Sequence, residues 1–464
     1  MKKRQSGVLM HISSLPGAYG IGSFGQSAYD FVDFLVRTKQ RYWQILPLGT
    51  TSYGDSPYQS FSAFAGNTHF IDLDILVEQG LLEASDLEGV DFGSNPAEVD
   101  YAKIYYARRP LLEKAVKRFL EVGDVKAFEK FAQDNQSWLE LFAEYMAIKE
   151  HFDNLAWTEW PDADARARKA SALESYREKL ADKLVYHRVT QYFFFQQWLK
   201  LKAYANENHI EIVGDMPIYV AEDSSDMWAN PHLFKTEENG KATHIAGCPP
   251  DEFSADGQLW GNPIYDWEAM DQDGYKWWIE RLRESFKIYD IVRIDHFRGF
   301  ESYWEIPAGS ETAAPGKWVK GPDYKLFAAV KEELGDLNII AEDLGFMTDE
   351  VIELRERTGF PGMKVLQFAF NPDHESIDSP HLAPANSVMY TGTHDNNTVL
   401  GWYRNEIDDP TREYMARYTN RKEYETVPHA MLRTVFSSVS FMAIATMQDL
   451  LELDESARMN FPST

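Results

Sequence analysis

Eight short apolar runs recur along the chain of 464 residues, and most of them end in a polar or charged residue. Runs of this length are typical of strands that are buried on both faces, as in parallel sheets. They occupy residues 7–10, 42–46, 211–215, 291–295, 338–342, 363–367, 387–390 and 442–446. A closed parallel barrel of this kind needs eight strands, so the number of runs predicts a (β/α)8 TIM barrel.

The sequence between several of these runs has the apolar spacing of amphipathic helices. Helices are predicted at residues 28–39, 273–289, 324–334 and 348–358. Parallel strands must be joined by crossover connections, and these connections are usually helices. The alternation of strands and helices therefore places the chain in the α/β class and supports the barrel interpretation.

Two stretches interrupt the alternation. Residues 75–184 have helical spacing over much of their length, as in 109–122 and 125–146, and a helix at 190–204 is expected to rejoin the barrel wall. Residues 216–267 are irregular and rich in Gly, Pro, Asn and aromatic residues, and a connection of such length is usually functional. The predicted domains are a catalytic barrel of residues 1–74 and 185–464, an inserted, mainly helical subdomain of residues 75–184, and a loop subdomain of residues 216–267 over the active site.

The charge of the chain excludes one class of partner. The 73 acidic and 46 basic residues give a net charge of −27, whereas binding to nucleic acid needs a basic surface. No apolar window reaches the roughly 18 residues of a membrane span, and the apolar stretch after the basic residues 1–4 is too short for a signal peptide. A single cysteine, Cys248, allows no intrachain disulfide. We therefore expect a cytoplasmic protein without nucleic-acid or membrane partners.

Three carboxylates near the ends of apolar runs are predicted to meet at one rim of the barrel. They are Asp295, Glu342 and Asp395. Parallel strands present their carboxyl ends at the same rim, and barrel enzymes place their catalytic residues there. Retaining glycosidases use one carboxylate as nucleophile and one carboxylic acid as proton donor, about 5–5.5 Å apart. The pattern therefore predicts chemistry on a glycosidic bond.

Arg293 lies two residues before Asp295, so both side chains are expected to point to the same side of a strand. The guanidinium is expected to lower the pKa of Asp295 and to keep it ionised. The structural alternatives are an ion pair for Asp295, a solvated carboxylate for Glu342 and a helix cap within residues 393–398. A metal site formed by His394, Asp395 and Asp295 is a further alternative, although no paired His spacing supports zinc.

Longer motifs surround these residues. They are HISSLPG at residues 11–17, SPYQS at 56–60, GDMPIY at 214–219, AGCPPD at 246–251, GQLWGNP at 257–263, RIDHFRG at 293–299, AEDLG at 341–345 and GTHD at 392–395. In this order and over almost the whole length, the chain resembles glycoside hydrolase family 77, the 4-α-glucanotransferases known as amylomaltases or disproportionating enzymes. The resemblance implies a retaining glycosyltransferase of carbohydrate metabolism on a TIM barrel, without cofactor or metal.

The resemblance also implies a role for each residue of the rim. Asp295 would be the nucleophile and Glu342 the acid and base. Asp395 would be the third carboxylate, which holds ring hydroxyls and distorts the sugar, with His394 beside it. Arg293 would support the nucleophile.

Three further residues are implied to contact substrate. Tyr58 resembles the substrate-contacting tyrosine of the family, and Asp251 and Trp260 fall on the loop that overhangs the acceptor side. The implied reaction cuts an α-1,4 bond of a maltooligosaccharide or of amylose and forms a β-glycosyl-enzyme. The glucan segment then passes to the 4-hydroxyl of glucose or of another glucan.

The resemblance leaves rival functions to consider. A hydrolase of the α-amylase type would share the barrel and typically bind calcium, but no acidic calcium-loop spacing stands out. A catalytically silent glucan-binding protein would be favoured if Asp295, Glu342 or Asp395 were replaced, and all three are present. Family members usually continue with a Trp-containing tail that packs after the last strand, and the sequence departs from this pattern because it stops at Thr464.

Overall fold

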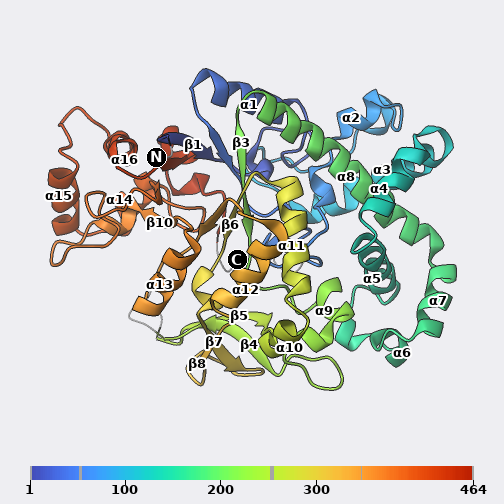
Figure 1. The fold of residues 1–464 in the computed structure, drawn as a ribbon. Coiled ribbons are helices and arrows are strands. Elements are labelled where there is room, and N and C mark those ends of the chain that lie inside the picture. The colour runs from blue at the N-terminus through green and yellow to red at the C-terminus, as the bar shows by residue number, and fades with distance from the viewer. Residues whose placement is uncertain (1–2, 52–54, 251–254, 346, 462–464) are drawn as a thin grey trace.

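Eight parallel strands form the centre of the computed structural model, which describes residues 3–51, 55–250, 255–345 and 347–461. The strand order is β10-β11-β12-β1-β2-β3-β6-β9, and a hydrogen bond of 2.9 Å from the Ala341 amide to the Pro361 carbonyl links the two ends. The sheet is therefore a nearly closed barrel (Figure 1). Its strands are β1 Gln5–Leu9, β2 Tyr42–Gln44, β3 Glu211–Met216, β6 Ile291–Ile294, β9 Ile339–Ala341, β10 Gly362–Val365, β11 Ser387–Tyr390 and β12 Met442–Thr446.

Each predicted apolar run overlaps one of these strands, so the barrel prediction is confirmed. Strand β6 illustrates why the runs are continuously apolar. Val292 and Ile294 pack outward in the large core shared with the helices, while Ile291 belongs to the smaller core inside the barrel. Because side chains alternate along a strand, Arg293 points inward on the same side as Ile291.

Helices cover the outside of the barrel (Figure 1). They are α1 Gln26–Arg37, α10 Trp267–Gln272, α11 Lys276–Ile288, α12 Tyr324–Leu334, α13 Asp349–Thr358, α14 Val399–Asn405, α15 Asp409–Tyr418, α16 Val427–Ser437 and α17 Met447–Leu450. The predicted helix 324–334 has the bounds of α12. The predicted helix 273–289 corresponds to α11, but its predicted start lies before the observed one. Tyr275 has a left-handed backbone with φ of 58°, which separates α10 from α11. No helix in the described part of the chain is long and apolar enough to cross a membrane.

Most of the remaining helices lie between β2 and β3 and extend to one side of the barrel (Figure 1). They are α2 Leu73–Glu78, α3 Tyr101–Val122, α4 Val125–Asp134, α5 Leu139–His151, α6 Ala163–Arg166, α7 Ala170–Lys179 and α8 Ala181–Glu207. The helical spacing of residues 125–146 corresponds to two helices, α4 and α5, because the chain turns at Asn135. The Asn135 side chain donates through Nδ2 to the Phe131 carbonyl at 2.8 Å, and its Oδ1 accepts from the Trp138 indole at 3.3 Å.

A second sheet lies at one edge of the barrel, and the sequence did not predict it (Figure 1). Its four antiparallel strands have the order β5-β4-β7-β8. They are β4 His244–Cys248, β5 Gln258–Pro263, β7 Ser302–Pro307 and β8 Lys317–Lys320, and the short helix α9 Ser225–Ala229 precedes them. The irregular character expected for residues 216–267 is therefore wrong for β4 and β5. The division into a barrel, a helical insertion and a loop subdomain stays a prediction.

Candidate active site

Asp295 and Glu342 follow two neighbouring strands of the barrel. The register of β6 and β9 pairs Ile294 with Ala341, so the next residue of each strand is a carboxylate at the same rim. The Glu342 amide donates to the Ile294 carbonyl at 3.1 Å, which continues the pairing to the end of β6. The prediction that these two residues would come together at the carboxyl ends of parallel strands is therefore confirmed in its geometry.

Arg293 bridges two carboxylates beneath this rim. Its Nη2 donates to Asp295 Oδ1 at 2.9 Å, and its Nη1 donates to both carboxylate oxygens of Asp215 at 2.7 Å. The side chain of Arg293 is 2% exposed and that of Asp215 is 1% exposed, whereas Asp295 is 32% exposed. Arg293 thus holds the underside of Asp295, while part of this carboxylate remains open to a substrate.

The sequence prediction of site residues missed Asp215, although it lies in the GDMPIY motif. The signal was a carboxylate near the end of the third apolar run, beside the run that carries Arg293. The register of β3 and β6 pairs Asp215 directly with Arg293. Asp215 also accepts a hydrogen bond of 2.9 Å from the Tyr58 hydroxyl. It therefore connects the arginine to the loop after β2.

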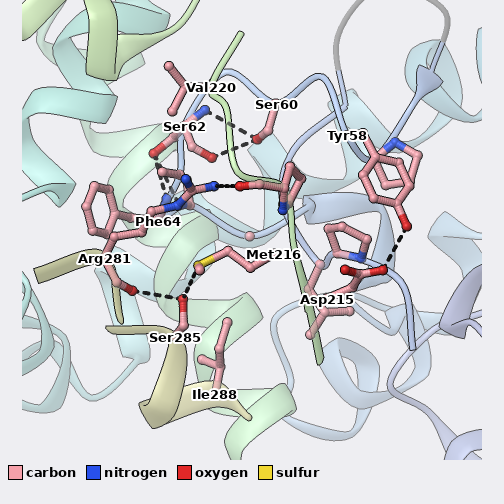
Figure 2. Close-up of a pocket in the computed structure, with 18 of the residues that line it drawn as sticks. Tyr58, Ser60, Ser62, Phe64, Asp215, Met216, Val220, Arg281, Ser285 and Ile288 are labelled. Carbon is pink, nitrogen blue, oxygen red and sulfur yellow. Dashed lines mark hydrogen bonds between the residues drawn. The ribbon is translucent and has the colours of Figure 1, made fainter. Parts of the chain in front are cut away.

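Tyr58 connects Asp215 to the third carboxylate. The Tyr58 hydroxyl lies 2.5 Å from His394 Nε2, and the two rings stack with their centroids 5.4 Å apart. His394 Nε2 lies 3.1 Å from Asp395 Oδ2. Figure 2 shows Tyr58 and Asp215 joined by their hydrogen bond beside a cavity of about 60 Å³, which is also lined by Arg281 and Ser285 of α11.

Asp395 lies in the loop after β11, and the end of the described chain also contacts it. Asn460 Nδ2 donates to Asp395 Oδ1 at 3.0 Å, and Arg458 Nη2 donates to its main-chain carbonyl at 3.0 Å. The helix-cap alternative for residues 393–398 is confirmed at Thr398, whose hydroxyl accepts from the Gly401 amide at 3.1 Å at the start of α14, while Asp395 lies outside this cap. Neither Arg458 nor Asn460 was predicted as a site residue, since their contact with Asp395 depends on the folded chain.

The two carboxyl groups of the rim differ in their protonation. Burial raises the pKa of Glu342 to about 7, and the negative charge of Asp295 adds to this rise, while Arg293 opposes it. Burial also raises the pKa of Asp295 against the opposing charge of Arg293, so the lowered pKa expected from the sequence is wrong in its net direction. Because Arg293 donates directly to the Asp295 carboxylate, the ionised form is favoured at Asp295, and its charge favours the protonated form of the neighbouring Glu342.

Asp395 is ionised over the whole neutral range. Its burial would raise the pKa, but the charge and hydrogen bond of His394 outweigh this effect and lower the pKa of Asp395 to about 2. Burial correspondingly opposes protonation of His394, and the charge and hydrogen bond of Asp395 overcome it and raise the His394 pKa. This side of the rim therefore offers a charged acceptor for sugar hydroxyls.

Trp260 lies on β5 beside the same rim. Its ring meets the ring of His296 edge-on, with centroids 4.7 Å apart. The Gln59 side chain donates through Nε2 to the Trp260 carbonyl at 3.3 Å, which connects the Tyr58 loop to the second sheet. The structure thus brings Trp260 next to the residue that follows Asp295, while Asp251 lies outside the described residues.

Among the described residues, no group of three or more His, Cys, Asp or Glu side chains is arranged to hold a metal ion. The alternative of a site formed by His394, Asp395 and Asp295 receives no support there. His394 instead bonds Tyr58 and Asp395 through its Nε2 atom.

Replacing Arg293 by Met is expected to destabilise the protein and to inactivate it. The variant leaves Asp215 as a buried carboxylate without its cation, and breaking a buried pair costs about 3–5 kcal/mol of unfolding free energy. Catalytic activity is expected to fall at least about 100-fold, because Asp295 loses its electrostatic support. Denaturant unfolding and activity of Arg293→Met and of the charge-retaining control Arg293→Lys test this. Unchanged stability of Arg293→Met would contradict the bridging role.

Comparisons with known proteins agree with one another. Residues 10–464 match the family Glyco_hydro_77, described as 4-alpha-glucanotransferase. A 4-alpha-glucanotransferase of Streptococcus pneumoniae is 95% identical over 464 residues, which cover 100% of this chain and 92% of the relative. One of Clostridium butyricum is 50% identical over 456 residues, which cover 98% of this chain and 93% of the relative. A solved amylomaltase from Streptococcus agalactiae in complex with acarbose has a TM-score of 0.97 at 50% identity, covering 100% of this chain and 93% of that one.

Proposed function

The chain belongs to the 4-alpha-glucanotransferase family, Glyco_hydro_77, and we propose that it moves α-1,4-glucan segments by a retaining mechanism of two displacements. The donors would be maltooligosaccharides or amylose, and the acceptor would be glucose or another glucan. The observation that carries the proposal is the pair of carboxyl groups on adjacent strand ends, of which Asp295 accepts a hydrogen bond of 2.9 Å from Arg293 while burial raises the pKa of Glu342 to about 7. The similar amylomaltase was solved in complex with acarbose, which supports binding of the same compound by this chain.

In the first displacement, the Asp295 carboxylate attacks the anomeric carbon of the donor. The glycosidic C–O bond breaks, and Glu342 gives its proton to the departing glucan oxygen. The product is a β-glycosyl ester on Asp295 and a released 4-hydroxyl. Because Arg293 bonds only one carboxylate oxygen, Oδ1, it orients Asp295 without occupying the other.

In the second displacement, the 4-hydroxyl of an acceptor attacks the same anomeric carbon from the opposite side. The Glu342 carboxylate takes the hydroxyl proton, the ester bond to Asp295 breaks, and a new α-1,4 bond forms. Two inversions give overall retention. A group that first donates and then accepts a proton works best when its pKa lies near the working pH, and the value of about 7 for Glu342 satisfies this condition.

Asp395 and His394 would act on the sugar ring next to the broken bond. Paired acceptors and donors can hold two ring hydroxyls, and hydrogen bonds that strengthen in the transition state accelerate the reaction. Tyr58 bonds Asp215 and His394 at once, so it would form the floor beneath that sugar. Trp260 would stack on the acceptor, and Asp251 is proposed to lie on the same side.

Transfer is distinguished from hydrolysis by incubation with pure maltotriose. We expect longer oligosaccharides and free glucose to appear while the total number of reducing ends stays constant. Rising reducing ends without longer products would instead indicate a hydrolase. No product of either kind would contradict the proposal and support a silent binding protein.

The rate of transfer is expected to fall as the pH rises above about 7. This is the value to which burial and the charge of Asp295 raise the pKa of Glu342, and only the protonated form can serve the leaving oxygen. The pH dependence of kcat/KM reports such groups in the free enzyme. A kcat/KM that stays constant from neutral to strongly alkaline pH would contradict the acid role of Glu342.

A further inference from the structure

His296 directly follows the proposed nucleophile and has an unusual backbone. Its φ of 54° and ψ of 49° place it in the left-handed region. Residues other than glycine adopt this region rarely, and they keep it only where their surroundings over-determine it. Such residues cluster at functional sites. The contacts of His296 must therefore stabilise its left-handed backbone.

The turn at His296 directs two successive amides at one residue. The His296 amide donates to Glu342 Oε2 at 2.7 Å, and the Phe297 amide donates to the Glu342 main-chain carbonyl at 3.1 Å. The other carboxylate oxygen, Oε1, accepts from the Leu344 amide at 3.0 Å. Both oxygens of Glu342 therefore accept main-chain amides, and one of these amides belongs to the residue directly after Asp295.

The ring of His296 is held by packing. It meets the Trp260 ring edge-on at 4.7 Å. A Cβ atom at Gly299 would lie 3.0 Å from its Cδ2 atom, so the absence of a side chain there leaves room for the ring. Its buried Nε2 has no hydrogen-bond partner among the described residues. Burial and the charge of Arg298 lower the His296 pKa to about 3, so the ring is neutral at working pH.

We propose that His296 is a positioning residue, whose ring, packed between Trp260 and Gly299, fixes the left-handed backbone that aims its amide at the Glu342 carboxylate. The inference rests on the proposed role of Glu342 as acid and base. It also couples the acceptor side, where Trp260 lies, to the group that takes the acceptor proton. A sugar that displaced Trp260 would change the packing of the His296 ring and, through it, the position of the His296 amide.

The amide has a definite electrostatic effect. A donor to a carboxylate favours the ionised form. The charged groups that act on Glu342 are Asp295 and Arg293, both from the end of β6. Burial and Asp295 raise the Glu342 pKa, whereas Arg293 and the amides of Leu344 and His296 lower it. Loss of the His296 amide should therefore raise this pKa further and weaken Glu342 as the base of the second displacement.

Three variants separate conformation from other effects. His296→Val places a β-branched residue where the left-handed region is unfavourable, while His296→Gly removes the ring but tolerates the conformation. Lys39→Val is the matched control, since Lys39 is an exposed residue with φ of 60° that precedes β2, away from the rim. The measurement is the pH dependence of kcat/KM for maltotriose transfer.

We expect His296→Val to move the alkaline limb upward by about one pH unit and to lower kcat/KM about tenfold. His296→Gly should move the limb less, and Lys39→Val should leave it in place. An unmoved limb in His296→Val, or an equal shift in His296→Gly, would overturn the proposal.

A second measurement uses the unmodified chain and does not depend on the folding of the Val variant. Selective ¹⁵N labelling of the 12 histidines gives a small set of amide signals, of which the one lost in His296→Asn belongs to His296. This signal should titrate with the pKa of the alkaline limb, and the titration should vanish in Glu342→Gln. A His296 signal that does not titrate would overturn the inference. Continued maltotriose transfer by Glu342→Gln would instead overturn the role of Glu342.

Discussion

Asp295→Asn is expected to abolish glucan transfer, with kcat reduced about 10⁴-fold or more. An amide is neutral and a poor nucleophile, so the glycosyl ester cannot form. The amide oxygen can still accept the bond from Arg293 Nη2, which reaches Oδ1 at 2.9 Å in the native chain. The variant is therefore expected to stay folded. Initial rates on maltotriose and a denaturant unfolding curve test both parts.

A matched control for this variant is Asp336→Asn. Asp336 is 89% exposed and pairs with Lys331 on the surface. Surface pairs contribute little to stability, so both activity and unfolding should stay near native values. Undiminished transfer by Asp295→Asn would remove Asp295 as nucleophile. Loss of activity together with loss of the fold would leave the two causes mixed, and Asp295→Glu, which keeps the charge, then separates them by its unfolding curve.

Glu342→Gln is expected to lose activity selectively, according to the donor. On maltotriose the rate should fall about 10²–10⁴-fold, the usual contribution of a general acid. On a maltosyl fluoride, whose leaving group needs no proton, formation of the glycosyl ester should be largely retained. The alkaline limb of the pH profile should also disappear. Burial raises the pKa of Glu342 to about 7, whereas the Gln side chain does not ionise.

The hydrogen bonds of Glu342 require a second variant as a control. Both carboxylate oxygens accept main-chain amides, so the NH2 group of Gln must face one donor. Glu342→Ala avoids this clash, and azide can then replace the acceptor and its base in the second displacement. Faster turnover of maltosyl fluoride with azide would support the assignment. An equal loss on maltotriose and on maltosyl fluoride would argue against an acid role.

The sequence predicts the barrel well because its strands are buried on both faces. Such strands appear as continuous apolar runs, and their polar ends mark the rim where Asp295 and Glu342 lie. The second sheet was not predictable in the same way. Its strands are short and contain Gly247 and Gly261, and they come from segments on both sides of β6. Only the folded chain brings these segments together.

The site was predicted where residues share a strand or a motif, and missed where contacts join distant segments. Arg293 and Asp295 are two residues apart, and their pairing follows from the alternation of a strand. Asp215 pairs with Arg293 across 78 residues, and Asn460 reaches Asp395 across 65 residues. The net pKa direction of Asp295 was also missed, because burial is a property of the tertiary fold.

The most direct test of the account is to trap the glycosyl-enzyme. Glu342→Gln should form the ester from maltosyl fluoride and pass it on slowly for want of a base, so the intermediate should accumulate. Mass spectrometry of a peptide digest locates the attached sugar. The account predicts one maltosyl group on Asp295, and none in the double variant that also carries Asp295→Asn. A sugar attached to another residue, or efficient turnover without any adduct, would contradict a double displacement through Asp295.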